Sequence, residues 1–209
     1  MKRAMFRFVL LLAAGSLLTG CVTFEFAPTE TLGCDPALAG TWHSDKDEGA
    51  RKGAAIFGRD CTLTGTNDDG STETYRLRTT EYDGHRYLVM QEDAAATVSD
   101  SDGKPIETWP ATRVNLLRYR LDGDRLEVWA ADPRVAATVD MRGVQTHSDA
   151  MRDPKTGKPI ESMVPSNIYL SGKRKRLAAL LRERGDALYS GMATDKALVL
   201  HRAPEGASP

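Results

Sequence analysis

Two Asp-Gly pairs, each between runs of alternating side chains, constrain the fold of this chain more than any other feature. Uncharged side chains alternate with arginines before the first pair, Asp83-Gly84, and the alternation resumes at Tyr87. The second pair, Asp122-Gly123, separates residues 117–121 from residues 126–130 in the same way. Such pairs favour a two-residue turn because both central residues need positive φ. The sequence therefore predicts two antiparallel β-hairpins.

Further short runs have strand character, and a third turn is predicted at Asn67–Gly70, between residues 61–66 and residues 72–82. The strands are half polar, which suits a sheet with one face buried and one face in water. We expect a mainly β protein: a single antiparallel β domain, either a barrel or a strongly curved meander. The additional strands are predicted at residues 40–44, 54–58, 166–170 and 197–202.

Two helices are predicted. The Asp132-Pro133 pair starts the first, because an acidic N-cap accepts backbone amides and proline suits the first helical position. We expect that helix to stop near Gly143. The second runs from Ser171 or Gly172 to Gly185, near the C-terminus.

The second helix carries a basic first turn, Lys173–Arg176. Positive charge has the wrong sign for a helix N-terminus. This run either contacts an anionic partner, such as lipid headgroup phosphates, or is a solvated surface whose charges pair with acidic neighbours.

Two long segments, residues 94–110 and 146–165, are predicted to be loops. They share an internal echo, since Gly103–Thr108 reads GKPIET and Gly157–Ser162 reads GKPIES. If the strands run up and down in sequence, both loops lie at one end of the sheet and the Asp-Gly turns at the other. The repeat has two interpretations. Either one end of the sheet carries two adaptable loops, or Gly-Lys-Pro is simply a favourable start for a strand and occurs twice.

The first twenty residues have the character of a signal peptide. Lys2, Arg3 and Arg7 precede an apolar run from Phe8 to Leu18. That run is too short to cross a bilayer, which needs about 20 apolar residues. We therefore exclude residues 1–20 from the fold.

The signal ends in Leu18-Thr19-Gly20-Cys21, which resembles the lipobox of bacterial lipoproteins at all four positions. The resemblance implies cleavage before Cys21 and lipid on its sulfur and amine, which would hold the protein on a membrane. Two or three acyl chains suffice for stable anchoring, whereas one does not. By the sorting rule of that family, Val22 after the cysteine implies the outer membrane, facing the periplasm. Residues 21–31 are predicted to be a short tether and residues 32–209 the domain.

Composition adds two constraints. The full chain has a formal charge of −1, and its signal contributes three of the 28 basic residues, so the exported part is acidic and offers no basic surface for nucleic acid.

With Cys21 lipidated, Cys34 and Cys61 remain. In an oxidising compartment such a pair is typical of a disulfide, and the alternative of a reactive thiol pair lacks CxxC spacing.

Gly40-Thr41-Trp42, on the first predicted strand of the domain, resembles the GxW motif of lipocalins. In that family the tryptophan closes the bottom of an eight-stranded cup, and a late helix followed by a last strand also fits the family plan. The whole layout is similar to small lipocalin-like envelope lipoproteins, a likeness that implies a fold and a location but no activity.

Two functions follow as alternatives. A barrel of about eight strands is either filled by side chains or holds one small ligand. The first alternative is a binding module for an apolar or amphipathic small molecule, and the second is an interaction protein that docks an envelope partner through its long loops or basic helix. An open apolar cavity would favour the first and a filled barrel with protruding loops the second. The residues expected to line a cup are Trp42, Tyr75, Tyr87, Met90, Tyr119 and Trp129.

Motifs of catalysis and of cofactor binding are absent from the sequence. There is no HExxH, GxSxG, GxGxxG or phosphate-binding loop, and the four histidines lie in unrelated segments without ligand spacing. Because no nucleophile or base can be paired from sequence alone, we expect no enzyme activity, no cofactor and no metal.

Overall fold

The computed structural model describes residues 21–44, 54–66, 71–92, 94–99, 104–149, 167–190 and 197–204. The predicted signal peptide, the predicted turn at Asn67–Gly70 and most of the predicted loop 146–165 lie outside these residues. The structural statements below refer to the described residues.

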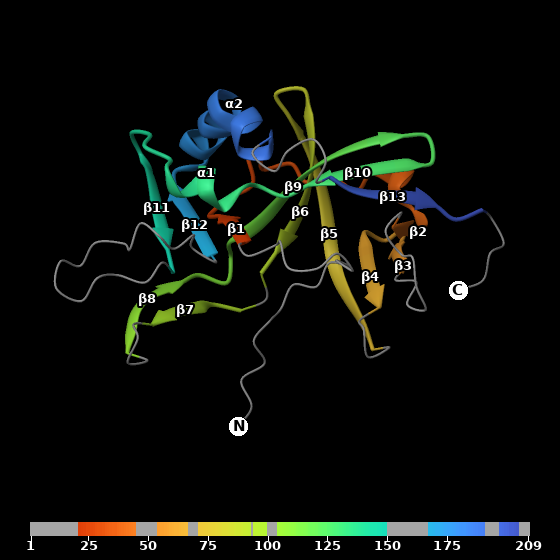
Figure 1. The fold of residues 1–209 in the computed structure, drawn as a ribbon, viewed down its shortest axis with the longest axis horizontal. Coiled ribbons are helices and arrows are strands. Elements are labelled where there is room, and N and C mark those ends of the chain that lie inside the picture. The colour runs from red at the N-terminus through yellow and green to blue at the C-terminus, as the bar shows by residue number, and fades with distance from the viewer. Residues whose placement is uncertain are drawn as a thin grey trace.

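Eight antiparallel strands close into a barrel (Figure 1), because β10 pairs with both β9 and β13. The predicted β-rich, lipocalin-like barrel is thereby confirmed. Around the barrel the strands are β2 (Gly40–Ser44), β3 (Ala54–Phe57), β4 (Thr62–Thr66), β5 (Thr72–Tyr82), β6 (His85–Gln91), β9 (Val114–Asp122), β10 (Arg125–Trp129) and β13 (Leu198–Arg202).

Both predicted hairpins are present. Asp83 and Gly84 form the turn between β5 and β6, with φ of 52° and 75°. The second turn is shifted by one residue from the prediction, because Asp122 still belongs to β9 and pairs with Arg125. Gly123, at φ 56°, then takes the first central position, where positive φ is required.

A side sheet extends from the barrel at β9. Strand β1 (Cys21–Phe24) pairs antiparallel with β9 and parallel with β12 (Asn167–Gly172), which pairs in turn with β11 (Val144–Ser148). The prediction of a tether at residues 21–31 is therefore wrong for its first four residues. Val22 and Phe24 are buried, and this apolar alternation places the segment inside the fold.

Two helices cover one face of the side sheet (Figure 1). Helix α1 (Pro133–Ala137) begins as predicted, with the Asp132 carboxylate accepting the Arg134 amide at 2.8 Å, but it ends before Gly143. Helix α2 (Arg174–Ser190) begins later than predicted and runs through Gly185. A Cβ at Gly185 would meet the Tyr87 hydroxyl at 4.0 Å, so packing against the barrel wall outweighs the helix-stopping tendency of glycine.

The predicted loop at residues 94–110 is instead a hairpin of β7 (Ala96–Ser99) and β8 (Pro105–Trp109). It lies between β6 and β9 in sequence, at the end of the barrel opposite the two-residue turns, as the up-and-down order predicts. Trp109 is buried and stacks on Tyr169 of β12, with ring centroids 5.7 Å apart. This contact with a distant strand gives the segment its order, and the local sequence did not reveal it.

Two hydrophobic cores share the strands β6 and β9. One fills the barrel and includes Leu88, Met90 and Tyr119. The other lies between the side sheet and the helices and includes Tyr87 and Val89. Because neighbouring residues of β6 point to opposite faces, both faces of this strand are buried.

Candidate functional site

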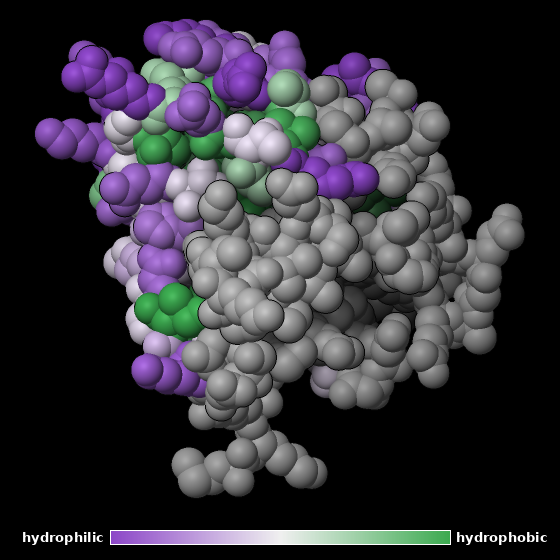
Figure 2. Space-filling model, turned by 60° about the vertical axis from the view of Figure 1, so that its left-hand side comes forward, coloured by the Kyte–Doolittle hydropathy of each residue, from purple (hydrophilic) through white to green (hydrophobic). Residues whose placement is uncertain are grey.

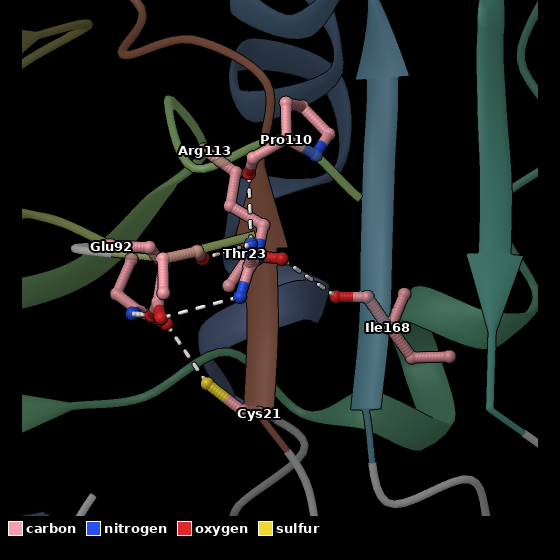
Figure 3. Close-up of polar contacts among 8 residues, drawn as sticks. Cys21, Thr23, Glu92, Pro110, Arg113 and Ile168 are labelled. Carbon is pink, nitrogen blue, oxygen red and sulfur yellow. Dashed lines mark hydrogen bonds and ion pairs between the residues drawn. The ribbon is translucent and has the colours of Figure 1, made fainter. Parts of the chain in front are cut away.

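Cys21 is the first residue of β1 and lies beside β9 (Figure 3). Its thiol donates to the Asn115 side-chain oxygen at 2.9 Å. Two residues along β1, the Thr23 hydroxyl donates to the Ile168 carbonyl of β12 at 3.3 Å. The strand that begins at Cys21 is thus paired with β9 on one side and with β12 on the other.

A buried ion pair borders this cysteine. Arg113 donates to the Glu92 carboxylate at 3.3 Å, and the Asn115 amide donates to the same carboxylate. The other Arg113 amino group donates to the carbonyls of Ala94 at 3.0 Å and Pro110 at 2.8 Å. These bonds tie together the two ends of the β7–β8 excursion (Figure 3) and pair the two buried charges, although Nε of Arg113 is buried without a hydrogen-bond partner.

This environment changes the acidity of the cysteine. The pKa of the Cys21 thiol is raised to about 12, chiefly by burial and next by the nearby Glu92 carboxylate, while the charge of Arg113 acts to lower it. Because the thiolate is the nucleophilic form, the folded, unmodified chain has an unreactive Cys21.

The predicted disulfide is confirmed. Cys34 and Cys61 are bonded, with their Cα atoms 5.6 Å apart. The bridge fastens the segment before β2 to the turn between β3 and β4, at the end of the barrel that carries the two-residue turns.

Trp42 closes this same end of the barrel. Its ring is fully buried, and its indole N–H donates to the Leu38 carbonyl at 2.8 Å. The guanidinium of Arg202, on β13, covers the ring 4.3 Å from its centroid. Arg202 also donates to the Ala37 carbonyl at 2.7 Å, so the short helix Pro36–Leu38 is held across the barrel end.

The barrel interior is packed. The space left between its aliphatic side chains is about 20 Å³, which is room for about one water molecule. Met90 and Leu117 border this space. This space is too small to hold a small apolar molecule.

The six predicted lining residues divide between the two cores. Trp42, Met90 and Tyr119 belong to the barrel core, and Tyr75 packs against it. The prediction is wrong for Tyr87 and Trp129, which belong to or pack against the core under the helices. The alternation of β6 and β10 placed these two on the outer face of the barrel, and the sequence did not show which face was which.

A polar groove of about 500 Å³ lies outside the barrel, between residues 29–35 and the end of the β5–β6 hairpin. At its centre, Asp35 accepts from the Tyr119 hydroxyl at 2.8 Å and from Arg86 at 3.4 Å. Burial raises the pKa of Tyr119, and its hydrogen bond to Asp35 and the charge of that carboxylate add to the effect. The phenol therefore stays protonated and acts as a donor.

No family model, characterised protein or solved structure matches this chain. Within the described part of the chain, no helix is long and apolar enough to cross a membrane.

Sequence reasoning missed the residues around Cys21. Glu92 and Arg113 stand at the two ends of a predicted loop, and Asn115 follows on a strand, so nothing local paired them. One signal was available. Glu92 comes directly after the strand β6 and Arg113 directly before β9, and two antiparallel neighbouring strands bring such positions close together.

Proposed function

We propose that this protein is a lipid-anchored lipoprotein of the bacterial envelope that docks a partner protein at the outer membrane, on the periplasmic side. The anchor is supported by the lipobox-like residues 18–21. Such a motif implies two or three acyl chains on one cysteine, which is enough for stable membrane binding, whereas a single chain is not. Since β1 begins at Cys21, an acylated Cys21 would leave no spacer between the lipid and the sheet. The side sheet that contains β1 would then lie next to the membrane surface.

The anchor is tested by the mass of the N-terminal peptide of full-length protein made in a Gram-negative host. We expect a peptide that begins at Cys21 and carries two or three acyl chains. A Cys21→Ser variant should keep its signal peptide and carry no lipid, whereas a Cys34→Ser/Cys61→Ser variant should be acylated normally. An unmodified Cys21 in the wild-type chain would contradict the proposal.

The packed barrel is the observation that carries docking over small-molecule carriage. With about 20 Å³ of interior space, the barrel serves as a rigid support rather than a cup. The β7–β8 hairpin lies at the end of the barrel opposite the two-residue turns, and Ile106 on β8 is 55% exposed. Figure 2 shows the neighbouring side of the molecule, where the coloured surface is largely hydrophilic with small apolar patches. Within this proposal, Ile106 is the apolar side chain that would anchor a protein partner.

Docking is tested by placing a photo-crosslinking amino acid at Ile106 in living cells. The matched control is Ile56, which is 38% exposed on the barrel strand β3. We expect a discrete crosslinked band from position 106 and none from position 56. Equal crosslinking from both positions, or none from either, would contradict a docking hairpin.

Small-molecule binding is the second candidate, and the polar groove beside Tyr119 favours it. The carboxylate, guanidinium and phenol there suit a small polar ligand rather than the apolar one expected from sequence. Native mass spectrometry of the gently purified protein tests it. A bound mass that an Arg86→Ala variant lacks would support a groove ligand, whereas a bare polypeptide would count against it.

A further inference from the structure

Three side chains from separate strands converge beside the β7–β8 hairpin. The Glu107 carboxylate of β8 lies 2.6 Å from Nδ1 of His147 on β11. On the other side of the ring, Nε2 of His147 lies 2.7 Å from the Ser171 hydroxyl of β12. The three residues are 40 and 24 positions apart along the chain, so the fold alone brings them together.

The side sheet fixes this geometry. His147 is paired with Tyr169 in the antiparallel β11–β12 ladder, which places Ser171 diagonally across from it on the same face. The Tyr169 ring stacks on the imidazole, with centroids 5.2 Å apart and planes 30° apart. Trp109, on β8 with Glu107, packs on Tyr169 as well. The imidazole is therefore held between its two polar partners by aromatic packing.

The bonding order defines the role of each group. An ionised carboxylate only accepts hydrogen bonds, so Nδ1 of His147 carries the proton that Glu107 accepts. In the neutral imidazole, Nε2 is then the acceptor for the Ser171 hydroxyl. A serine bonded to an imidazole that is oriented by a carboxylate is the arrangement that activates a serine nucleophile.

We propose that Ser171 is a nucleophile for acyl transfer from carboxylic esters, with His147 as its general base and Glu107 as the positioning residue. In the first step the Ser171 oxygen bonds to the ester carbonyl carbon, and its proton passes to Nε2 of His147. The carbon–oxygen bond to the alcohol breaks, and the alcohol takes that proton. Water then attacks the acyl-serine by the same route, which releases the acid and restores Ser171.

The surroundings set the expected rate. Ser171 is half-buried, and the Glu107 side chain is 37% exposed, so the relay borders solvent. Helix α2 begins three residues after Ser171 with a basic first turn, which favours negative charge at this end. However, Glu25 accepts the Gly172 amide at 2.7 Å, so that amide is taken in the resting protein. Each missing oxyanion donor costs about 10²–10³ in rate, so covalent labelling is a more sensitive assay than turnover.

This proposal does not depend on the lipid anchor or on docking, and it departs from the expectation of no enzyme activity. The test is the reaction of full-length protein in detergent with an alkyl fluorophosphonate. The serine oxygen displaces fluoride from phosphorus, and peptide mass spectrometry locates the adduct. We expect the adduct on Ser171 and none in a Ser171→Ala variant. The matched control is Ser148→Ala, one residue from His147, which should label at the wild-type rate.

Two further variants separate catalysis from a structural role. His147→Asn should slow labelling by about 10²–10⁴ because the general base is lost. Glu107→Gln should also slow it by at least about tenfold, because an amide no longer fixes the imidazole tautomer. Both should melt within a few degrees of the wild type. Labelling of Ser171 that is absent, that persists only in denatured protein, or that is unchanged in His147→Asn would overturn the proposal.

Discussion

At the scale of single residues, Cys21 has two incompatible requirements. As the proposed lipid acceptor, it would have to present its sulfur to an enzyme at a membrane. As the first residue of β1 it donates to Asn115 next to a buried carboxylate, and burial first and Glu92 second raise its pKa to about 12. A thioether sulfur has no proton to donate to Asn115 and would carry a bulky diacylglyceryl group, so lipidation would exclude this buried arrangement of Cys21.

The reactivity of the unmodified thiol measures this protection. At pH 8, a rise in pKa from the ordinary 9.0 to about 12 lowers the thiolate fraction about a thousandfold. We expect iodoacetamide to alkylate Cys21 correspondingly slowly in folded, oxidised, unlipidated protein, and rapidly in 8 M urea. The rate should keep rising with pH up to about 12. Equal rates in folded and unfolded protein would show that the sulfur is exposed.

At the scale of elements, the β7–β8 hairpin is the least expected feature and is held at two places. The Glu92–Arg113 pair closes its base, and the pairing of Glu107 with His147 fastens β8 to the edge strand β11. The hairpin thus carries the exposed Ile106 on a fixed support. For this reason the docking and acyl-transfer proposals concern neighbouring residues of one strand.

The base of the hairpin can be broken by one substitution. Arg113→Ala would leave the Glu92 carboxylate buried without its cation, and we expect a loss of about 3–5 kcal/mol in the free energy of unfolding, measured by urea titration. Arg182→Ala, in the exposed pair with Glu183, is the matched control and should change stability by less than about 0.5 kcal/mol. A loss below about 1 kcal/mol for Arg113→Ala would mean that water already reaches the pair.

At the scale of the whole molecule, the barrel and the helix-covered side sheet are built as one unit. The Tyr189 hydroxyl of α2 donates to the Leu116 carbonyl of β9 at 3.0 Å, and Asp186 accepts from Arg118 at 2.9 Å. Since β6 and β9 contribute side chains to both cores, neither core can unfold without exposing part of the other. We therefore expect barrel and side sheet to unfold in one cooperative transition.

The disulfide should stabilise this unit as a whole. Cys34 and Cys61 are 27 residues apart, and closing a loop of that length restricts the unfolded chain by about 3.5 kcal/mol. We expect a Cys34→Ala/Cys61→Ala variant to lose about that amount in urea titration, with a single transition retained. Under a reducing agent, the wild type should fall to the stability of the variant. If the reduced wild type remained more stable than the variant, the variant would have lost side-chain packing and not only the restriction of the unfolded chain.

Much of the barrel was predictable because its signals are local. Positive φ at Asp83 and Gly84 is a requirement of the turn itself, and the Asp132 cap needs only the next two residues. The strands around them follow from alternation. The Cys34–Cys61 bridge was predicted from the proposed export signal, which implies an oxidising compartment, and from the number of cysteines rather than from any contact.

The sequence by itself predicted a mainly antiparallel β domain, the two Asp-Gly hairpins and the disulfide, because each depends on neighbours in the chain or on the number of cysteines. The tertiary structure alone decided that β1 is a buried strand, that Tyr87 and Trp129 face outward, and that Glu107, His147 and Ser171 meet. The physical reason is that these contacts join residues far apart in the sequence. Thr23 bonds to Ile168 across 145 residues, and such a pairing is set by which faces the whole fold must bury.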